Sequence, residues 1–470
     1  MKEENKHILL ICIEFIQPLF SGNGILTQGL VRGLLTHPRK TQTYHITVVC
    51  ARPESKRGDP AEIFPSNDMT TGDGDGDGDG NGSADPFASA IEDGRLNIIV
   101  CDVPDHKWRK LDRSSCWSDI LHKAPSMFQS HCRDLNVDYS YSHIFAIDWS
   151  ALPTAYKFQE LMMQMQLFKS SPSSATKLVY FVFRVFAASK ELCQSQEDYE
   201  FYKNNELSGM KAADLTILLS HVDKKALESE FQLDLCAHNW NQNTHILVPP
   251  LRHDIHCQAT AASKRSLSSV GDDDDEKLDA GYSNENDPKP RFILCNARLS
   301  PEKNALRFAQ IMNILHKKKI LQKLNLQPLL IGAICDKEYA DKVYSLLPSD
   351  SIIENRFMAS HEMSRYLQKT VLNIHPSIYD AYGMTVAEAA AFGVPSIIHK
   401  ECIGASSLLR EEHGEILFDD MISDAEISSH RIEFVLCEDR EKLRQVGKNA
   451  RRRALSWSIN DYAGMLHTKL

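Results

Sequence analysis

The sequence lacks the features of several large classes of protein. No apolar run approaches the roughly 18 residues that cross a bilayer, and the first residues, MKEENKHILLICIEF, lead directly into a strand-like segment without a cleavage site. Basic residues are not in excess, because the 470 residues carry a formal net charge of −10, which argues against nucleic acid as a general partner. We therefore expect a cytoplasmic protein without a transmembrane segment, for which peripheral contact with a membrane stays open.

Paired cysteines are also missing. The 12 cysteines are scattered without a CxxC pair, and several lie in apolar runs, where cysteine packs as a small hydrophobic residue. His253, His256 and Cys257 have ligand-like spacing, but no second cluster completes a tetrahedral metal site. The segment from Asp75 resembles the first half of a calcium loop, yet its twelfth position is Pro86 instead of glutamate. We expect reduced thiols and no metal ion.

What the chain does contain is an alternation of short apolar runs with segments that fit helices. Such runs, bounded by turn residues, are typical of strands that are buried on both faces of a parallel sheet. The length and the 42% hydrophobic content suit two or three domains of about 150 residues each. The predicted fold class is α/β, with strands in the N-terminal half at 7–13, 44–50, 96–101, 143–147, 177–183, 215–220 and 245–248.

The most informative stretch is PSIYDAYGMTVAEAAAFGVP, residues 376–395. A buried apolar strand precedes it, and the alanine-rich residues 385–392 predict a helix that ends at a glycine. Gly383 therefore lies at the helix start, where the free amide groups of Gly383, Met384 and Thr385 can bind an anion. Because position 383 has no side chain, a phosphate can approach the backbone closely.

Two carboxylates flank this anion site. Asp380 lies in the loop before the helix, and Glu388 lies eight positions later, about one turn inside it. A buried acid so close to a phosphate needs hydroxyl donors, which sugar or ribose groups supply. The pattern predicts a site for a nucleotide sugar, and an ordinary strand-loop-helix unit with solvated acids is the alternative.

This stretch resembles the E-x7-E signature of retaining glycosyltransferases of the GT-B type, most closely glycosyltransferase family 4. The resemblance implies two Rossmann-like domains that face each other across a cleft, with a C-terminal helix that crosses back to the N-terminal domain. In that family the first acid faces the transferred sugar and the second holds the ribose, which implies these roles for Asp380 and Glu388. Two positions depart from the family: the first acid is aspartate instead of glutamate, and Tyr382 stands where phenylalanine is usual.

A basic pair follows the first strand expected in the second domain, at 292–297. Arg298 and Lys303 lie after its carboxyl end, which is the edge of an open α/β sheet where ligands bind. From this edge they can reach a diphosphate at the Gly383 helix start. The segment resembles the family's G-R-L-x-x-x-K motif, which implies that both cations contact the diphosphate without a metal ion.

The first strand of the chain leads into a glycine loop at residues 20–24. Such a turn can hold a phosphate, although tight-turn geometry alone would also account for its glycines. The resemblance implies that Gly22 and Gly24 face the cleft, beside the acceptor and the donor phosphates. Asp148 stands in a segment similar to the HDW motif of glycogen synthase-like enzymes, but the histidine position is Ile147.

Two polar segments divide the chain. A stretch rich in glycine and aspartate predicts a disordered loop at 66–90, and an acidic stretch predicts a disordered linker at 258–290. Arg252, shortly before the linker, either faces the cleft or is solvated. The predicted domains are an N-terminal Rossmann-like acceptor domain at 1–257, a C-terminal Rossmann-like donor domain at 291–455, and a helix returning to the N-terminal domain at 456–470.

The predicted function is that of a hexosyltransferase, which moves a sugar from a nucleotide diphosphate sugar to an acceptor hydroxyl group. The resemblance implies that the reaction retains configuration and is metal-independent, that no cofactor takes part, and that the acceptor is a sugar, a lipid or a protein. A catalytically inactive nucleotide-sugar-binding or scaffold protein is the alternative, and a sugar-nucleotide epimerase or a phosphorylase would share the architecture. The predicted catalytic residues are Asp380, Arg298 and Lys303, and the predicted donor-binding residues are Gly22, Gly24, Arg298, Lys303, Tyr382, Gly383, Met384, Thr385 and Glu388.

Overall fold

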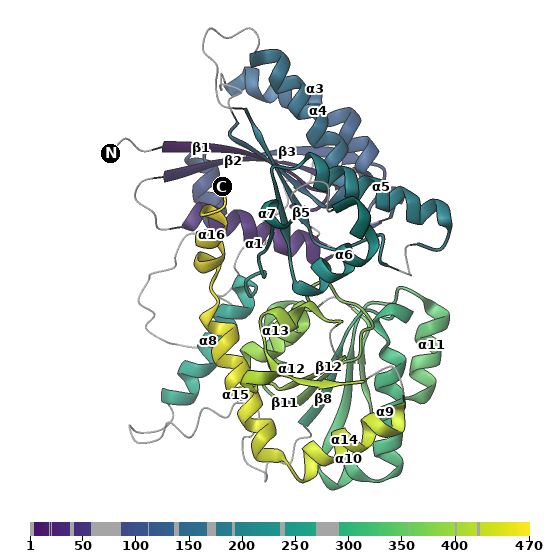
Figure 1. Cartoon of the computed structure of the whole chain (residues 1–470). Helices are drawn as coiled ribbons and strands as arrows, with labels where there is room; N and C mark the ends of the chain where they lie inside the picture. The colour runs from purple at the N-terminus through teal and green to yellow at the C-terminus, as the bar shows by residue number, and fades with distance from the viewer. Residues whose placement is uncertain are drawn as a thin grey trace.

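The computed structural model shows two α/β domains, one above the other in Figure 1. Within the residues that it describes, no helix has the length and the apolar character needed to cross a bilayer. The described residues are 4–17, 19, 21–37, 42–57, 86–110, 112–135, 141–166, 175–189, 193–235, 240–268, 291–356, 358–399, 402–420 and 424–470.

The N-terminal domain is built on a sheet of seven parallel strands in the order β3-β2-β1-β4-β5-β6-β7. The order reverses between β1 and β4, and ligands of open α/β sheets bind beside such a switch point, outside the carboxyl ends of the strands. The strands, which confirm the seven predicted runs, are β1 (Glu4–Ile11), β2 (Gln42–Pro53), β3 (Leu96–Val103), β4 (His143–Ile147), β5 (Lys177–Val182), β6 (Leu215–Leu218) and β7 (Thr244–Ile246).

Alternate residues of these strands pack on opposite faces of the sheet. Ile8 and Leu10 of β1 belong to the core under α1, whereas Leu9 and Ile11 belong to the core under α3, α4 and α5. Burial on both faces explains why each strand appears in the sequence as a continuous apolar run. The helices of this domain are α1 (Gly22–Thr36), α2 (Pro86–Glu92), α3 (Trp117–Leu135), α4 (Asp148–Gln166), α5 (Gln196–Ala212), α6 (His221–Leu235) and α7 (Trp240–Asn243).

The C-terminal domain repeats this design with a parallel sheet of six strands in the order β10-β9-β8-β11-β12-β13. Its strands are β8 (Arg291–Asn296), β9 (Leu326–Ile331), β10 (Ile352–Glu354), β11 (Thr370–His375), β12 (Ser396–His399) and β13 (Leu417–Asp419). Its helices are α9 (Ala305–Lys317), α10 (Ile320–Lys323), α11 (Lys337–Leu346), α12 (Ser360–Leu367), α13 (Met384–Ala391) and α14 (Ala425–Cys437). Short 3-10 helices lie at Glu54–Lys56, Asp105–Lys107, Pro301–Lys303, Gly404–Ser407 and Glu411–His413.

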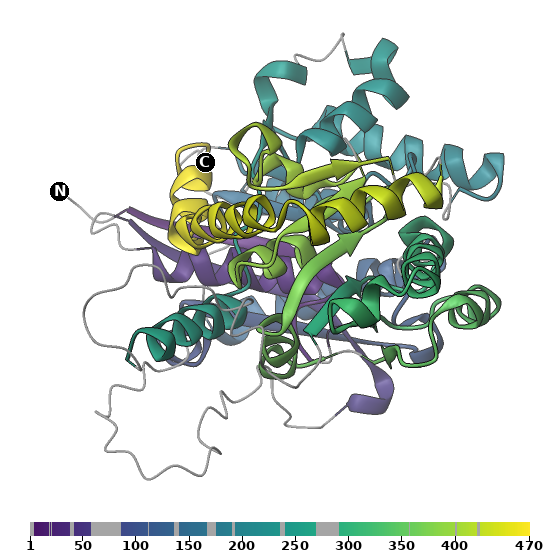
Figure 2. The same ribbon diagram turned by 90° about the horizontal axis from the view of Figure 1, so that it is seen from below.

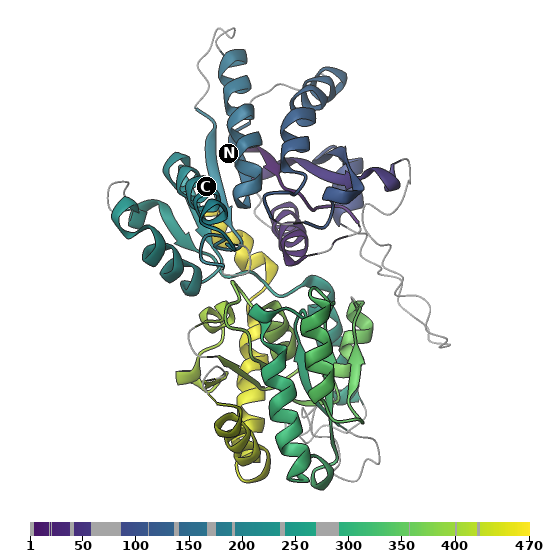
Figure 3. The ribbon, with the colours of Figure 1, turned by 90° about the vertical axis from the view of Figure 1, so that its right-hand side faces the viewer.

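Three further helices join the domains. α8 (His253–Ser268) follows the N-terminal sheet and packs against α12 and α13. α15 (Arg440–Ser456) packs along α13, and α16 (Ile459–His467) lies against α1 of the N-terminal domain. The yellow end of the chain crosses the green C-terminal domain in Figure 2 and spans both domains in Figure 3. The predicted return of the C-terminal helix is confirmed.

The predicted boundaries need two corrections. Residues 258–268 of the predicted linker are helical, because α8 extends to Ser268 and buries apolar residues such as Ala259 against the C-terminal domain. The predicted loop at 66–90 is likewise too long, because α2 starts at Pro86 and buries Phe87. Residues 66–85 and 269–290, together with the segment that resembles a calcium loop, lie outside the described residues.

Candidate active site

The predicted anion site lies where α13 starts, beyond the carboxyl end of β11. Gly383 has φ +75°, and a Cβ atom there would come within 2.8 Å of Ile403 Cγ2, so this position requires glycine. The next two amide groups, those of Met384 and Thr385, donate to no group of the described residues. They stay available to an anion at the positive end of the helix dipole.

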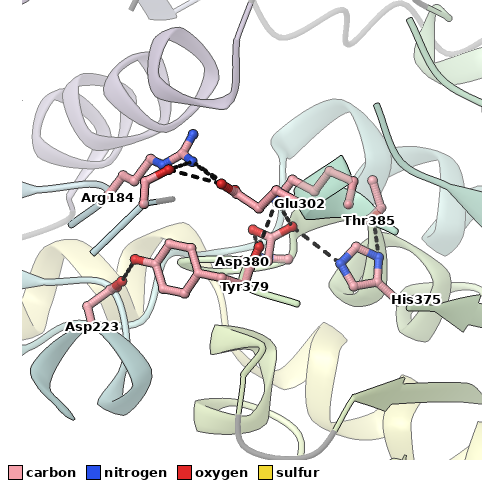
Figure 4. A network of polar contacts seen from close by, with 10 residues as sticks. Arg184, Asp223, Glu302, His375, Tyr379, Asp380 and Thr385 are labelled. Carbon is pink, nitrogen blue, oxygen red and sulfur yellow. Dashed lines mark hydrogen bonds and ion pairs between the residues drawn. The ribbon is translucent and has the colours of Figure 1, made fainter. Parts of the chain in front are cut away.

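Asp380 fills part of this site with its own carboxylate (Figure 4). Oδ1 accepts the Gly383 N–H at 2.9 Å, and Oδ2 lies 2.8 Å from Lys303 Nζ and 3.3 Å from His375 Nε2. Burial opposes ionisation, but Lys303 and His375 hold the pKa of Asp380 well below its usual range. The shorter aspartate side chain is therefore ionised and bound to the start of the helix.

The two predicted cations have different surroundings. Lys303 is buried, and it donates to Asp380 and to the carbonyl oxygen of Tyr379, the latter at 3.2 Å. Arg298 is exposed, and its side chain has no hydrogen bond or ion pair with any residue that the structure describes. Both residues follow β8, which is next to β11 in the sheet. Arg298 is thus the cation of this pair whose charge is not already balanced.

Glu388 is buried one turn inside α13 and pairs with Arg252. Arg252 Nη1 donates to Glu388 Oε1 at 3.3 Å, while Nε and Nη2 bind the two carboxylate oxygens of Asp254 at 3.1 and 2.6 Å. Burial raises the pKa of Glu388, and the Arg252 guanidinium acts against this rise. Of the two alternatives for Arg252, the solvated one is wrong, because its side chain is only 17% exposed and contacts the opposite domain.

The glycine loop of the N-terminal domain meets this site. A Cβ atom on Gly22 would lie 3.3 Å from Met384 Sδ, so Gly22 and the start of α13 face each other directly. Gly24 has a packing role, since a Cβ atom there would come within 2.7 Å of Leu19 Cδ2. Glu14, which the sequence did not single out, holds the loop by accepting the Ser21 N–H at 3.0 Å.

Asp148 lies at the switch point of the N-terminal sheet, directly after β4. It is buried with φ +59°, accepts the Phe183 N–H at 2.7 Å, and accepts a hydrogen bond from the Asn23 side-chain amide. Burial raises the pKa of Asp148 to about 7. A pocket between the ends of β1 and β4 is lined by Cys12, Ile13, Glu14, Asn23, Thr27, Ile147, Asp148, Ser150 and Phe186.

A polar network joins the two domains beside Asp380 (Figure 4). Arg184 Nη2 lies 2.7 Å from each carboxylate oxygen of Glu302, the residue before Lys303. Tyr379 donates its hydroxyl hydrogen to Asp223 Oδ1 at 2.7 Å. The sequence did not reveal these contacts, because each pair joins residues more than a hundred positions apart in different domains.

Tyr382 is also an interdomain residue. It is buried, and its hydroxyl group donates to the Pro249 carbonyl oxygen at 3.0 Å. Phenylalanine, which the resemblance leads one to expect at this position, could not make this bond. Tyr382 therefore fastens the start of α13 to the segment that leads into α8.

The ligand-like spacing of His253, His256 and Cys257 falls within one helix. The three residues lie on α8, where Cys257 Sγ is 3.6 Å from His253 Nε2. Within the described ranges, no group of three or more histidine, cysteine, aspartate or glutamate residues is arranged to hold a metal ion.

Comparisons with known proteins agree with this architecture. Residues 281–453 match the family model of "Glycosyl transferases group 1". No curated protein sequence matches the chain. The matched residues comprise the C-terminal domain with Arg298, Lys303, Asp380 and Glu388.

Solved structures similar to the whole chain have the GT-B fold. A sucrose-phosphate synthase from Thermosynechococcus elongatus is 15% identical with a TM-score of 0.63, and the match covers 98% of each chain. The Anabaena protein HepE in complex with UDP-glucose is 15% identical with a TM-score of 0.58, covering 99% of this chain and 100% of that one. An E. coli trehalose-6-phosphate protein bound with UDP-2-fluoro glucose is 11% identical with a TM-score of 0.60, covering 98% of each chain. The two sheets of this chain therefore form a GT-B fold.

Proposed function

We propose that this chain, which through residues 281–453 belongs to the glycosyl transferases group 1, moves a sugar from a nucleotide diphosphate sugar to an acceptor hydroxyl group with retention and without a metal ion. One observation carries the proposal. Arg298, the free amide groups at the start of α13, and Glu388 gather at the carboxyl ends of β8 and β11, opposite Gly22 of the other domain.

The departing diphosphate is the group for which this site is best suited. Its negative charge grows as the bond to the sugar breaks, and fixed donors that face this charge lower the barrier most. Arg298 supplies a cation that pairs with no residue in the described part of the chain, and Met384 and Thr385 supply amide donors in the dipole of α13. Positive charge from the chain itself would then take the place that a metal ion holds in other diphosphate sites.

Lys303 and Asp380 act in the proposed reaction as a pair. The Asp380 carboxylate is bound by the Lys303 ammonium and by the Gly383 amide. These two bonds orient the carboxylate and keep it from acting as a nucleophile. It can still accept hydroxyl hydrogens of the transferred sugar, because a carboxylate has about four acceptor sites. Glu388 would accept the ribose hydroxyl groups.

The bond changes follow from this arrangement. The acceptor oxygen bonds to the anomeric carbon on the face from which the diphosphate leaves, and the bond from that carbon to the phosphate oxygen breaks. The hydroxyl proton passes to the leaving phosphate oxygen, so that a glycoside and a nucleoside diphosphate result. Attack on the same face retains the configuration.

A catalytically inactive protein that only binds a nucleotide sugar remains the second candidate. Two contacts favour it, because Asp380 is already paired with Lys303 and Glu388 with Arg252. Binding without hydrolysis or transfer would support this alternative, whereas turnover would exclude it.

The test is a thermal-shift and hydrolysis screen of UDP-, GDP- and ADP-sugars in EDTA. UDP-sugars come first because two of the similar structures hold them. We expect one donor to raise the Tm of the wild type and to release sugar, and we expect both effects to be lost in Arg298→Ala and Glu388→Ala. Lys323→Ala, which removes an exposed cation of α10, is the control and should behave as wild type. Equal binding by the two site variants would show that the donor site is elsewhere.

A further inference from the structure

Glu388 has surroundings that do not favour its charge. It is 5% exposed, and apart from Thr385, whose hydroxyl group lies 3.5 Å from His375 Nδ1, the other residues of α13 are apolar side chains that cannot solvate a carboxylate. A buried carboxyl group without a cation takes up a proton, and a protonated acid binds hydroxyl groups less strongly than a carboxylate does. The charge of Glu388 therefore depends on what faces it.

Arg252 is the cation that faces Glu388, and it is held in a fixed orientation. Nε and Nη2 form a fork with both oxygens of Asp254, and Asp254 Oδ1 also accepts the Ile255 N–H at 2.9 Å. The remaining nitrogen, Nη1, points to Glu388 Oε1. Arg252 thus contacts one oxygen of Glu388 and leaves the other without a hydrogen bond to any described residue.

The segment that carries Arg252 is bound to both domains. Tyr382 donates to the carbonyl oxygen of Pro249, and Trp457 Nε1 donates to that of Val248 at 3.0 Å. These bonds fix the segment from 248 to 252 between α13 and the connection from α15 to α16. Arg252 therefore has little freedom to leave Glu388 when a ligand arrives.

We propose that Arg252 is a positioning residue that keeps Glu388 ionised and oriented, so that the free carboxylate oxygen accepts a ribose hydroxyl group of the donor. The inference rests on the proposed function and adds a residue from the N-terminal half of the chain to the donor site. Arg252 would act on the nucleotide through Glu388, without touching the reacting atoms.

The titratable groups around Glu388 set the sign of the expected effect. Arg252 favours the carboxylate, while burial and the negative charge of Asp254 disfavour it, and Tyr382 is neutral in its buried site. If Arg252 is replaced by a neutral residue, burial and the charge of Asp254 still raise the pKa of Glu388, so Glu388 is protonated up to a higher pH. Nucleotide affinity should then fall at low pH and recover as the pH rises.

The experiment is a calorimetric titration of the intact chain with the nucleoside diphosphate that stabilises the wild type in the donor screen. Wild type, Arg252→Met, Arg252→Lys, Glu388→Gln and Arg252→Met/Glu388→Gln are compared between about pH 6 and about pH 9. The ratio of the variant Kd to the wild-type Kd removes the titration of the phosphate itself.

For Arg252→Met we expect a Kd ratio of about ten or more near the lower pH limit. The ratio should approach one at the upper limit, because the charge-assisted bond from the ribose hydroxyl group to Glu388 is lost only while Glu388 is protonated. Arg252→Lys keeps the charge and should keep the wild-type pH profile. Glu388→Gln should bind more weakly with a ratio that does not change with pH. In that background, Arg252→Met should have no further effect.

Other outcomes would overturn the inference. A ratio for Arg252→Met that stays constant with pH means that Arg252 has only a structural role. Tighter binding means that Arg252 competes with the nucleotide for Glu388. The Tm shows whether Arg252→Met folds. If it does not fold, the test is carried by Arg252→Lys and Glu388→Gln: a Kd ratio that changes with pH for Arg252→Lys, with a constant ratio for Glu388→Gln, would count against the proposal. If the wild type binds no nucleotide, the proposed function fails, and the inference fails with it.

Discussion

Three carboxyl groups of the N-terminal domain are buried close to the place where the domains meet. Burial raises the pKa of Asp148 to about 7 and those of Glu206 and Asp223 to about 8. Asp148 and Glu206 accept main-chain N–H groups of the segment after β5, including that of Phe186 at 2.6 Å. These acids hold the segment that carries Arg184, and they do so partly protonated near neutral pH.

Asp223→Asn tests this protonation at a single residue. An amide can still accept the Tyr379 hydroxyl hydrogen, but it never has to ionise in the buried site. The folded pKa of about 8 lies above the unfolded one, so the wild type loses stability as the pH rises from the unfolded to the folded pKa. The variant should therefore gain stability relative to wild type by about 1 kcal/mol per pH unit in this window, and the difference should level off above it.

Urea unfolding of Asp223→Asn and wild type between about pH 5 and about pH 9 measures this difference. Serine at position 220 offers a matched control, since Ser220→Ala removes a hydrogen-bond donor to Asp223 without removing the titratable group. The free energy of unfolding of Ser220→Ala relative to wild type should not change with pH in the same way. A constant difference for Asp223→Asn would mean that Asp223 is ionised throughout.

At the scale of elements, the loop after β12 supports the loop that contains Asp380. Asp380 N–H donates to the Cys402 carbonyl oxygen at 3.0 Å, and Gly404 N–H donates to the Asp380 carbonyl oxygen at 2.8 Å. The two loops thus continue the parallel pairing of β11 with β12 beyond the sheet. This pairing fixes the backbone from which the Asp380 carboxylate reaches Lys303.

Gly404→Ala should disrupt this pairing. A Cβ atom on Gly404 would lie 1.9 Å from the Ala381 carbonyl oxygen, which is backbone and cannot move aside without shifting Asp380. We expect a loss of about 3 kcal/mol or more in stability, above the usual cost of overpacking, together with loss of the donor-induced Tm shift. Differential scanning fluorimetry with and without donor checks both.

The matched control for Gly404→Ala is Gly29→Ala in α1. A Cβ atom there would meet no atom within 4 Å, and alanine favours a helix interior, so the variant should be stabilised by about 0.5 to 1 kcal/mol. An undisturbed Gly404→Ala variant would show that the two loops are not held in this register.

The local elements of the site follow from the sequence, whereas its pairings do not. The run before Pro376, the alanine-rich helix and Gly383 at its start each depend on neighbouring residues, so periodicity and propensity predict them. Arg252 and Glu388 are 136 positions apart along the chain, so their contact depends on how the two domains meet. The contact between Lys303 and Asp380 likewise depends on how two loops meet that are 77 positions apart along the chain. The second half of α8 was missed for a different reason, because its apolar residues are sparse within a polar segment.

At the scale of the whole molecule, the domains are held together by side chains from both sides of the site. Arg184 and Glu302 are 13% and 9% exposed, and Ser189 Oγ donates to Glu302 at 3.0 Å. On the α6 side, the His221 N–H donates to Ser407 Oγ at 3.0 Å. These contacts hold the two walls of the site against each other.

Arg184→Met should shift the chain to an open arrangement of the domains. The substitution leaves the buried Glu302 carboxylate without its cation, and breaking a buried pair in this way costs about 3 to 5 kcal/mol. Opening the domains lets water reach Glu302 and avoids this cost. Small-angle X-ray scattering should therefore give a larger radius of gyration for the variant than for wild type, and donor affinity should fall about tenfold or more, because the closed state has to be recovered on binding.

Two further variants decide whether the charge of this pair holds the domains. Arg184→Met/Glu302→Gln removes both charges, so it should return towards the wild-type radius of gyration, since no buried charge is left unpaired. Lys342→Met breaks an ion pair with Glu338 in which the side chains are 62% and 83% exposed, and it should change neither the radius nor the affinity. If Arg184→Met scatters as wild type and binds the donor equally well, the pair does not hold the domains, and the interdomain contacts of Arg252, Tyr379 and Tyr382 are sufficient to keep the chain closed.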